Sequence, residues 1–321
     1  MKATVLYGPV QEDLALVEEA LQSLKEVDFP PLARMMELAL SGGGKRLRPA
    51  LVLLAGRLGD YNLEMLVPLA ASVELLHAAT LVHDDVIDNA ATRRGRPTAN
   101  SRFPSSTTVM LGDYMFAHAA ELVARTGNVR VIRLFAHTLM VMAKGEIRQD
   151  MSAYDSRQTV RDYLGRIAGK TASLFTTAGE GGAIASGQPE DCITALRSYG
   201  YNLGMAFQII DDILDFTGDE EELGKPIGSD LMQGTLTLPS LLLMECYPHD
   251  NPVRQLFGQP DKEQYLQRAV EMIRNSGIPE EAHRLAEGFC HNAREALAVF
   301  PECPARRTLY DLTDYVLARR S

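Results

Sequence analysis

Two stretches of the sequence repeat one acidic pattern: two aspartates, two aliphatic residues and a third aspartate. The aspartates are Asp84, Asp85 and Asp88 in the first stretch, and Asp211, Asp212 and Asp215 in the second. Residues four apart share one face of an α-helix, so each stretch would point two carboxylates in the same direction. Each stretch ends a long apolar run, where repulsion between carboxylates is unfavourable unless a cation compensates it. The pattern predicts a metal site.

Carboxylate oxygens are hard ligands, which favour Mg²⁺, with Mn²⁺ as the alternative ion. Mg²⁺ usually takes one or two carboxylates and completes its shell with water and substrate phosphates, so we expect a diphosphate substrate. A single cluster would be better explained as a solvated helix end, although the helix dipole disfavours carboxylates at a C-terminus. Two copies on two apolar helices favour the metal site.

Two short basic segments could bind the phosphates. Lys45 and Arg48 follow three glycines at 42–44, and Arg93 and Arg94 follow the first aspartate cluster. Arginine forks and lysine point charges suit a diphosphate, and glycines let backbone amides approach an anion. The first segment alone would be a solvated basic loop. Together with the aspartates, it indicates substrate binding.

The elements that must position these residues are helices. Apolar residues recur at helical spacing almost everywhere, while the alternation typical of strands is nearly absent. Glycine and proline clusters divide the chain into about ten to twelve helices. The segments 63–89 and 191–216, which end in the aspartate clusters, are apolar around their whole circumference and therefore belong at the centre of a bundle. The prediction is an all-α, single large helical bundle around a central apolar cavity.

Length and composition indicate the number of domains and exclude some classes of protein. The chain has 321 residues, of which 46% are hydrophobic, and no long linker or repeat divides it, so we expect one domain over residues 1–321. A net charge of −10 argues against nucleic-acid binding. The four cysteines form no close pairs, which suits a reducing cytoplasm. The longest apolar stretch contains Glu64, Glu74 and His77, so we expect at most transient membrane contact.

Taken together, the basic segment and the two acidic motifs, in this order, resemble those of the trans-type isoprenyl diphosphate (polyprenyl) synthases. The resemblance extends from roughly Ser41 to Ser240. It implies an all-α fold of the isoprenoid synthase type and a homodimer, with a heteromer as the alternative. It also implies a prenyltransferase that joins isopentenyl diphosphate head to tail onto an allylic diphosphate.

The same resemblance assigns roles to individual residues. The isopentenyl diphosphate site would comprise Lys45, Arg48, His77 and Arg94. The allylic diphosphate site would comprise Arg93, Lys170, Thr171, Gln208 and Lys225. The main Mg²⁺ ligands would be Asp84, Asp85, Asp88 and Asp211, with Asp212 and Asp215 supporting them or binding through water. His77 has a plainer explanation as a satisfied core histidine. The sequence departs from many family members at Thr235, where they carry a second lysine.

The expected chemistry is ionisation of the allylic diphosphate, attack by the isopentenyl double bond, and loss of a proton. Cationic groups would stabilise the departing diphosphate, and apolar walls would exclude water. Lys170, Thr171 and Gln208 would act catalytically by turning dipoles toward the carbocation, and the released diphosphate could accept the proton.

Product length should depend on the residues below Asp84. Ala79 and Thr80 are small, whereas the resemblance implies an aromatic ring there in short-chain synthases. Further limits would come from residues deeper on the same helix and on the helix that follows: Leu76, Val73, Met115, Phe116 and Ala119. We expect a medium- or long-chain product, longer than farnesyl, with geranylgeranyl as the nearer alternative.

Three other interpretations remain open. A terpene cyclase shares the first motif but has no use for an isopentenyl diphosphate site. A regulatory partner subunit of a heteromeric synthase would be expected to lose aspartates, and all six are present. A helical scaffold would leave both acidic clusters unexplained.

Overall fold

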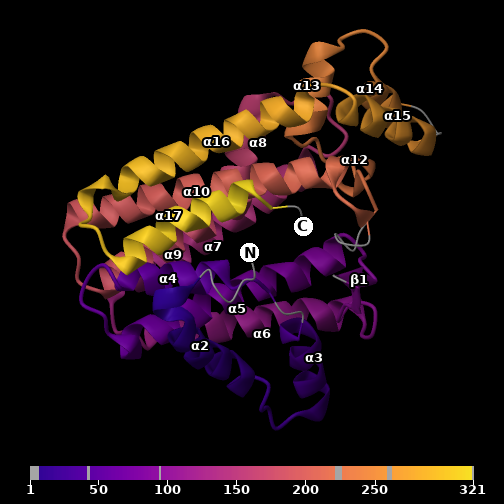
Figure 1. Ribbon diagram of the computed structural model, residues 1–321. Coiled ribbons are helices and arrows are strands. Elements are labelled where there is room, and N and C mark those ends of the chain that lie inside the picture. The colour runs from indigo at the N-terminus through magenta and orange to yellow at the C-terminus, as the bar shows by residue number, and fades with distance from the viewer. Residues whose placement is uncertain (1–6, 42–43, 94, 221–225, 259–261, 320–321) are drawn as a thin grey trace. The chain divides into compact units, whose positions relative to one another are not determined.

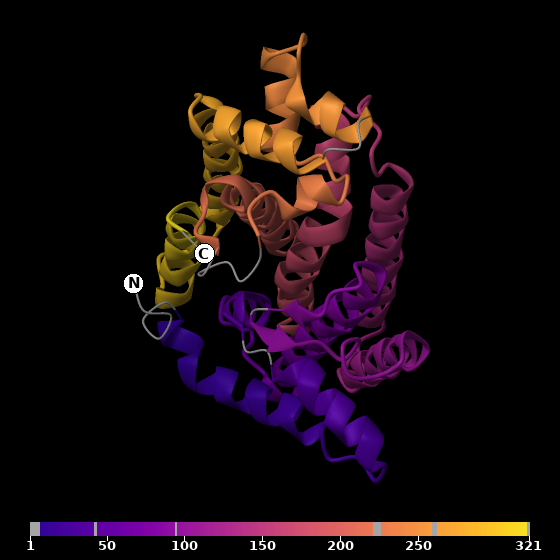
Figure 2. The ribbon, with the colours of Figure 1, turned by 90° about the vertical axis from the view of Figure 1, so that its right-hand side faces the viewer.

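The computed structural model describes residues 7–41, 44–93, 95–220, 226–258 and 262–319, and helices dominate them (Figures 1 and 2). The helices up to residue 151 are η1 (Gly8–Val10), α2 (Gln11–Ser23), α3 (Pro30–Leu40), α4 (Leu47–Gly56), α5 (Leu63–Ile87), α6 (Ser105–Ala124) and α7 (Val129–Met151). The later helices are α8 (Val160–Ile167), η2 (Ala168–Ala172), α9 (Ser173–Ala185), α10 (Glu190–Thr217), α12 (Ser229–Met232), α13 (Leu238–Cys246), α14 (Pro252–Gly258), α15 (Lys262–Arg274), α16 (Ile278–Ala296), η3 (Leu297–Val299) and α17 (Pro304–Leu317).

The all-α prediction is confirmed. The number of helices among the described residues exceeds the ten to twelve that we expected, because several of them are short. For example, α12 has only four residues and lies between the longer helices α10 and α13. A helix of one turn is too short for its apolar spacing to stand out in the sequence.

The chain divides into two compact units. The first comprises Met1–Thr138, Leu174–Gly200 and Ala296–Leu312, and the second comprises Leu139–Ser173, Tyr201–Glu295 and Thr313–Ser321. The first aspartate cluster belongs to the first unit and the second cluster to the second unit. One domain over residues 1–321, built around a central apolar cavity, stays a prediction.

In the first unit, α4 packs against α5, and α5 packs along α6 (Figure 1). Most of α4 is buried, and a Cβ atom on Gly182 of α9 would lie 2.5 Å from the backbone oxygen of Val52. Only glycine allows α9 to approach α4 so closely, so the tight packing in this unit depends on Gly182.

Helix α5 carries the first aspartate cluster at its C-terminal end. Asn62 caps its start by accepting a hydrogen bond from the Glu64 amide, and Asp88 is its C-cap residue. Asn89 follows with φ of 50°, the left-handed conformation that commonly ends a helix. Among the described helices, α5 is long and apolar enough to cross a membrane by length and composition alone, and 61% of its most apolar window is buried. Core helices pass the same test.

The first cluster is followed by a small hairpin that the sequence did not reveal. Strand β1 (Thr92–Arg93) pairs antiparallel with β2 (Arg96–Pro97). Gly95 in the turn has φ of 72°, which glycine tolerates without strain. The hairpin fixes the backbone of Arg93 just beyond the end of α5.

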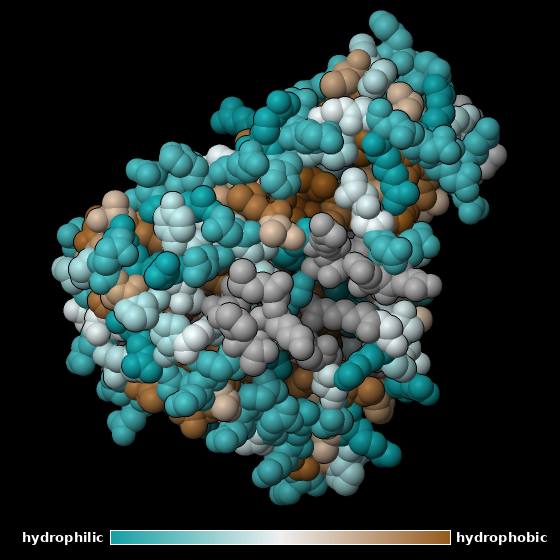
Figure 3. Space-filling model, viewed as in Figure 1, coloured by the Kyte–Doolittle hydropathy of each residue, from teal (hydrophilic) through white to brown (hydrophobic). Residues whose placement is uncertain are grey.

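In the second unit, a capping box starts α8, because Thr159 and Asp162 each bond the other's backbone amide. The next turn, η2, is π-helical, a geometry that often marks functional sites. Helix α16 is amphipathic: Ala282, Ala286 and Cys290 are buried, while hydrophilic side chains cover its outward face (Figure 3).

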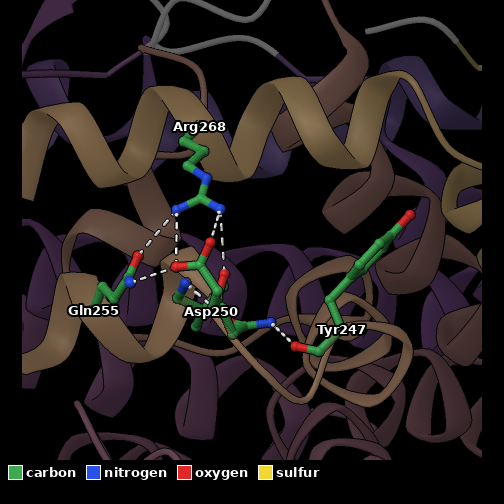
Figure 4. A network of polar contacts seen from close by, with 6 residues as sticks. Tyr247, Asp250, Gln255 and Arg268 are labelled. Atoms are coloured by element: carbon green, nitrogen blue, oxygen red, sulfur yellow. Dashed lines mark hydrogen bonds and ion pairs between the residues drawn. The ribbon is translucent and has the colours of Figure 1, made fainter.

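Polar contacts close the connection between α13 and α14 in this unit (Figure 4). Arg268 of α15 donates to Asp250 at 2.6 Å, and Gln255 donates to the same carboxylate at 2.9 Å. The Asp250 backbone is left-handed, with φ of 50°. Arg268 and Gln255 therefore anchor a turn residue rather than a substrate.

Candidate functional site

The three aspartates of the first cluster have different surroundings. Asp88 is exposed, Asp84 is half-buried and Asp85 is buried. The Nε–H of Arg93 donates to Asp85 Oδ1 at 2.7 Å. Burial raises the pKa of Asp85, the positive charge of Arg93 opposes the rise, and the negative charge of Asp84 adds to it. Asp84 and Asp88 are therefore the accessible carboxylates, one turn apart on α5, while Asp85 is tied to the hairpin.

Part of the expected isopentenyl diphosphate site lies in the same unit. Lys45 is exposed just before α4, and Arg48 lies in the first turn of α4 with its guanidinium 4.5 Å from the centre of the Phe175 ring. His77 is half-buried on α5, seven residues before Asp84 and therefore on the same face of the helix. Cationic and metal-binding candidates thus belong to the same compact unit.

The second cluster has a different architecture. Asp211 is half-exposed and accepts a hydrogen bond from Arg319 at 3.0 Å. Asp212 is fully buried, where it accepts from the Tyr163 hydroxyl at 2.6 Å and from Gln208 at 2.8 Å. Asp215 is also fully buried and accepts from the Ser229 hydroxyl at 3.1 Å.

Burial raises the pKa of Asp212 to about 7, and the charges of Asp230 and Asp211 add to the rise. Hydrogen bonds from Tyr163 and Gln208 favour the ionised form and therefore limit the rise in the pKa of Asp212. Asp212 therefore accepts hydrogen bonds inside its own unit and is not exposed to a ligand from solvent. Asp211 is therefore the accessible carboxylate of the second cluster.

The expected catalytic residues of the second unit also lie together. The Thr171 hydroxyl donates to the Gln208 side-chain oxygen at 2.6 Å, and the Gln208 side-chain nitrogen donates to Asp212 at 2.8 Å. Lys170 donates to Glu146 at 2.8 Å. Lys170 and Thr171 both occupy the π-helical turn η2. The sequence-predicted grouping of Lys170, Thr171 and Gln208 is therefore compatible with the local geometry.

The residues expected to limit product length lie on α5 and α6, which pack together. Five of them are completely buried: Val73, Leu76, Ala79, Met115 and Ala119. Thr80 and Phe116 are half-buried, and the Phe116 ring meets His83 edge-on, with centroids 5.2 Å apart. Buried apolar side chains thus occupy the region of α5 and α6 that precedes Asp84.

Two expected site residues, Arg94 and Lys225, lie outside the described residues. Thr235, which stands where a lysine was expected, is half-buried and donates its amide to the backbone oxygen of Asp230 at 2.9 Å. The next residue, Leu236, accepts a hydrogen bond from the buried Arg166. Arg166 brings a cation close to this stretch, and burial lowers its pKa.

Comparisons with known proteins agree with these motifs. A family model described as polyprenyl synthetase matches residues 29–273. The chain is 40% identical to heptaprenyl diphosphate synthase component 2 of Geobacillus stearothermophilus over 98% of both chains. The structure of a decaprenyl diphosphate synthase from Rhodobacter capsulatus matches with a TM-score of 0.91 and 38% identity, covering 99% of each chain. A polyprenyl synthase from Caulobacter crescentus CB15, complexed with calcium and isoprenyl diphosphate, matches with a TM-score of 0.94 and 36% identity, covering 100% of this chain and 98% of that one.

The chain belongs to the polyprenyl synthetase family. It is therefore a prenyltransferase that elongates prenyl diphosphates, and its fold is the all-α isoprenoid synthase fold.

Family membership raises the question of which residues could hold a divalent metal. Within the part of the chain that the structure describes, no three His, Cys, Asp or Glu side chains are grouped closely enough to hold an ion by themselves. The donor chemistry still fits Mg²⁺, because Asp84 and Asp88 offer hard oxygens from consecutive turns. Mg²⁺ commonly completes its shell with water and substrate phosphates.

Sequence reasoning missed several partners of the aspartates. Tyr163, Arg319 and Ser229 each bond one aspartate of the second cluster, and Glu146 bonds Lys170. No local pattern marks these residues, because each lies 14 or more residues from its partner along the chain. Glu74 did carry a signal: a carboxylate in the middle of an apolar helix requires a buried partner.

Proposed function

We propose that the protein catalyses Mg²⁺-dependent condensation of isopentenyl diphosphate with an allylic diphosphate, giving a product longer than farnesyl diphosphate. The observation that carries the proposal is that the accessible Asp84 and Asp88 and the cations Lys45 and Arg48 belong to the same unit of a polyprenyl synthetase. A terpene cyclase would need the acidic cluster without the basic segment.

Each group would have a distinct task. In the first unit, Asp84 and Asp88 would hold Mg²⁺, which supplies charge stabilisation for the departing diphosphate. In the second unit, Asp211 would be the metal ligand. Lys45, Arg48 and His77 would bind isopentenyl diphosphate, since ammonium and guanidinium groups suit phosphate oxygens. Asp85, Asp212 and Asp215 would support the site from buried positions, consistent with their hydrogen bonds.

In the first unit, Arg93 would bind the allylic diphosphate. In the second unit, the hydrogen-bonded group of Lys170, Thr171 and Gln208 would contribute to allylic substrate binding. The Thr171 hydroxyl fixes the amide of Gln208 at 2.6 Å, so that its dipole is oriented before the carbocation forms. Apolar side chains on α5 and α6 would exclude water that could capture the cation. The proton would leave with the released diphosphate.

The proposal of a product longer than farnesyl diphosphate is supported by Ala79, a small residue that is completely buried one turn before Asp84. The relatives described above are named for heptaprenyl and decaprenyl products. Extraction and chain-length analysis of products made from labelled isopentenyl diphosphate tests the proposal. We expect products with more than three isoprene units, and farnesyl diphosphate as the sole product would contradict it.

A heteromeric enzyme is a second candidate, because the Geobacillus stearothermophilus relative is named component 2 of its synthase. We propose a cytoplasmic homodimer as the simpler assembly. Turnover by the purified chain alone, with light scattering of the active species, separates the two. A dimer that turns over supports the homodimer. Inactivity with geranyl, farnesyl and geranylgeranyl diphosphates alike supports the heteromer.

A further inference from the structure

Arg46 lies between Lys45 and Arg48, but its side chain binds two carboxylates of the protein. Its Nη1 donates to Glu74 of α5 at 2.7 Å, and its Nε donates to Glu18 of α2 at 3.0 Å. Helices α2, α4 and α5 all pack against one another in the first unit. The guanidinium of Arg46 therefore joins the start of α4 to both neighbouring helices.

The Arg46 network is largely buried. The Glu74 side chain is 10% exposed and the Arg46 side chain 22%, whereas Glu18 is 41% exposed. Removing one member of such a pair leaves a poorly solvated charge uncompensated. Glu74 should consequently matter more than Glu18.

The backbone of Arg46 is also unusual. It has φ of 49° and ψ of 33°, the left-handed conformation that non-glycine residues adopt at a conformational cost. The Tyr7 hydroxyl donates to the backbone oxygen of Lys45 on one side, and Arg48 begins its helical turn on the other. The ion pairs of Arg46 therefore hold a strained turn between two expected substrate ligands.

The same network sets the position of this turn relative to α5. Glu74 and His77 are three residues apart and so share one face of the helix. Anchoring Arg46 to Glu74 places the Lys45–Arg48 segment beside the face that carries His77. Arg46 itself is neutralised by Glu74 and Glu18, and the proposed function assigns the phosphate contacts to Lys45 and Arg48.

We propose that Arg46, Glu74 and Glu18 form a positioning network for the isopentenyl diphosphate site. The network holds the turn in the conformation that directs Lys45 and Arg48 to the same diphosphate. This inference rests on the proposed function, and its test must separate the two.

The test compares KM for isopentenyl diphosphate in Glu74→Gln and Glu18→Gln with that of the wild-type protein. We expect KM to rise about tenfold in Glu74→Gln, which corresponds to about 1.4 kcal/mol, and about two- to threefold in the more exposed Glu18→Gln. The kcat and the KM for the allylic diphosphate should stay within about twofold, a split that general loss of structure would not produce. Glu64→Gln, on the exposed first turn of α5, is the matched control.

Arg46→Gly provides a second test, because glycine adopts the left-handed turn without strain, so the variant removes the network while it preserves the backbone conformation. We expect the same rise in KM as in Glu74→Gln. A wild-type KM in Arg46→Gly would overturn the proposal, and so would a wild-type KM in folded Glu74→Gln. Should Glu74→Gln fail to fold, an unchanged KM in Glu18→Gln would overturn it.

Lys45→Gln distinguishes failure of this inference from failure of the proposed function. If Lys45→Gln raises KM for isopentenyl diphosphate and the network variants do not, the substrate site stands and the network has no positioning role. If Lys45→Gln also leaves KM unchanged, the assignment of the substrate site is wrong.

Discussion

The two aspartate clusters have the same spacing in sequence but different environments in the structure. In the first, Asp84 and Asp88 are accessible, and the buried Asp85 binds a nearby arginine. In the second, Asp212 and Asp215 are fully buried and hydrogen-bonded, which leaves Asp211 accessible. The comparison suggests a division of labour: the first cluster is built to exchange ligands, and the second to hold a buried polar frame that presents one carboxylate.

The largest expected effect is a loss of activity without a loss of stability when an aspartate of the first cluster is replaced. Asp84→Asn should lower kcat/KM by about 10²- to 10³-fold, because it removes a negative charge that would hold the Mg²⁺ needed by the departing diphosphate. The free energy of unfolding should change by less than about 0.5 kcal/mol, since Asp84 is only half-buried. Initial rates and urea denaturation measure both quantities. Asp60→Asn, at an exposed site away from the clusters, is the control, and equal activity in the two variants would remove Asp84 from the site.

The opposite balance is expected in the second cluster. Asp212→Ala should lower the free energy of unfolding by about 2–4 kcal/mol, because it leaves the buried Tyr163 hydroxyl and the Gln208 amide without their acceptor. Urea denaturation measures the change, and Asp212→Asn, which keeps the shape, should lose less. If Asp212→Ala were as stable as the wild-type protein, the second cluster would not be a structural frame.

Product length provides a third contrast between the clusters. Ala79 lies five residues before Asp84, and Ala206 lies five residues before Asp211; both are completely buried. Ala79→Phe should shorten the product by one or more isoprene units, because a ring would block the apolar path along α5. Ala206→Phe is the matched control and should not shorten the product. Chain-length analysis of the extracted products checks this, and an unchanged length in Ala79→Phe would place the path elsewhere.

The smallest effect concerns the ion pair of the second cluster. Arg319 bonds Asp211 at 3.0 Å, so a metal ion must compete with the guanidinium. Arg319→Gln should lower the Mg²⁺ concentration needed for half-maximal activity by about two- to fivefold, the range expected for a partly exposed ion pair. Metal titration of the initial rate measures it. An increased requirement would show that Arg319 supports metal binding instead.

Helical spacing was enough to predict the fold class and the long helices α5 and α10. The prediction that α10 is apolar on every side was wrong, because Arg197 and Ser198 are exposed. The β1–β2 hairpin could not be predicted, because two-residue strands have no period. The segments that carry chemistry were also visible in sequence. The difference between exposed Asp88 and buried Asp215 was not, because it depends on Ser229 and other partners that only the tertiary fold brings together.

Manganese binding measured by electron paramagnetic resonance, with a non-reactive thiolo analogue of farnesyl diphosphate present, tests the division of labour most directly. We expect Mn²⁺ to bind the wild-type protein together with the analogue and to bind Asp84→Asn at least tenfold more weakly, roughly 1.4 kcal/mol. Asp212→Asn should retain binding closer to the wild-type value. Undiminished binding in Asp84→Asn, with loss in Asp212→Asn, would contradict the account.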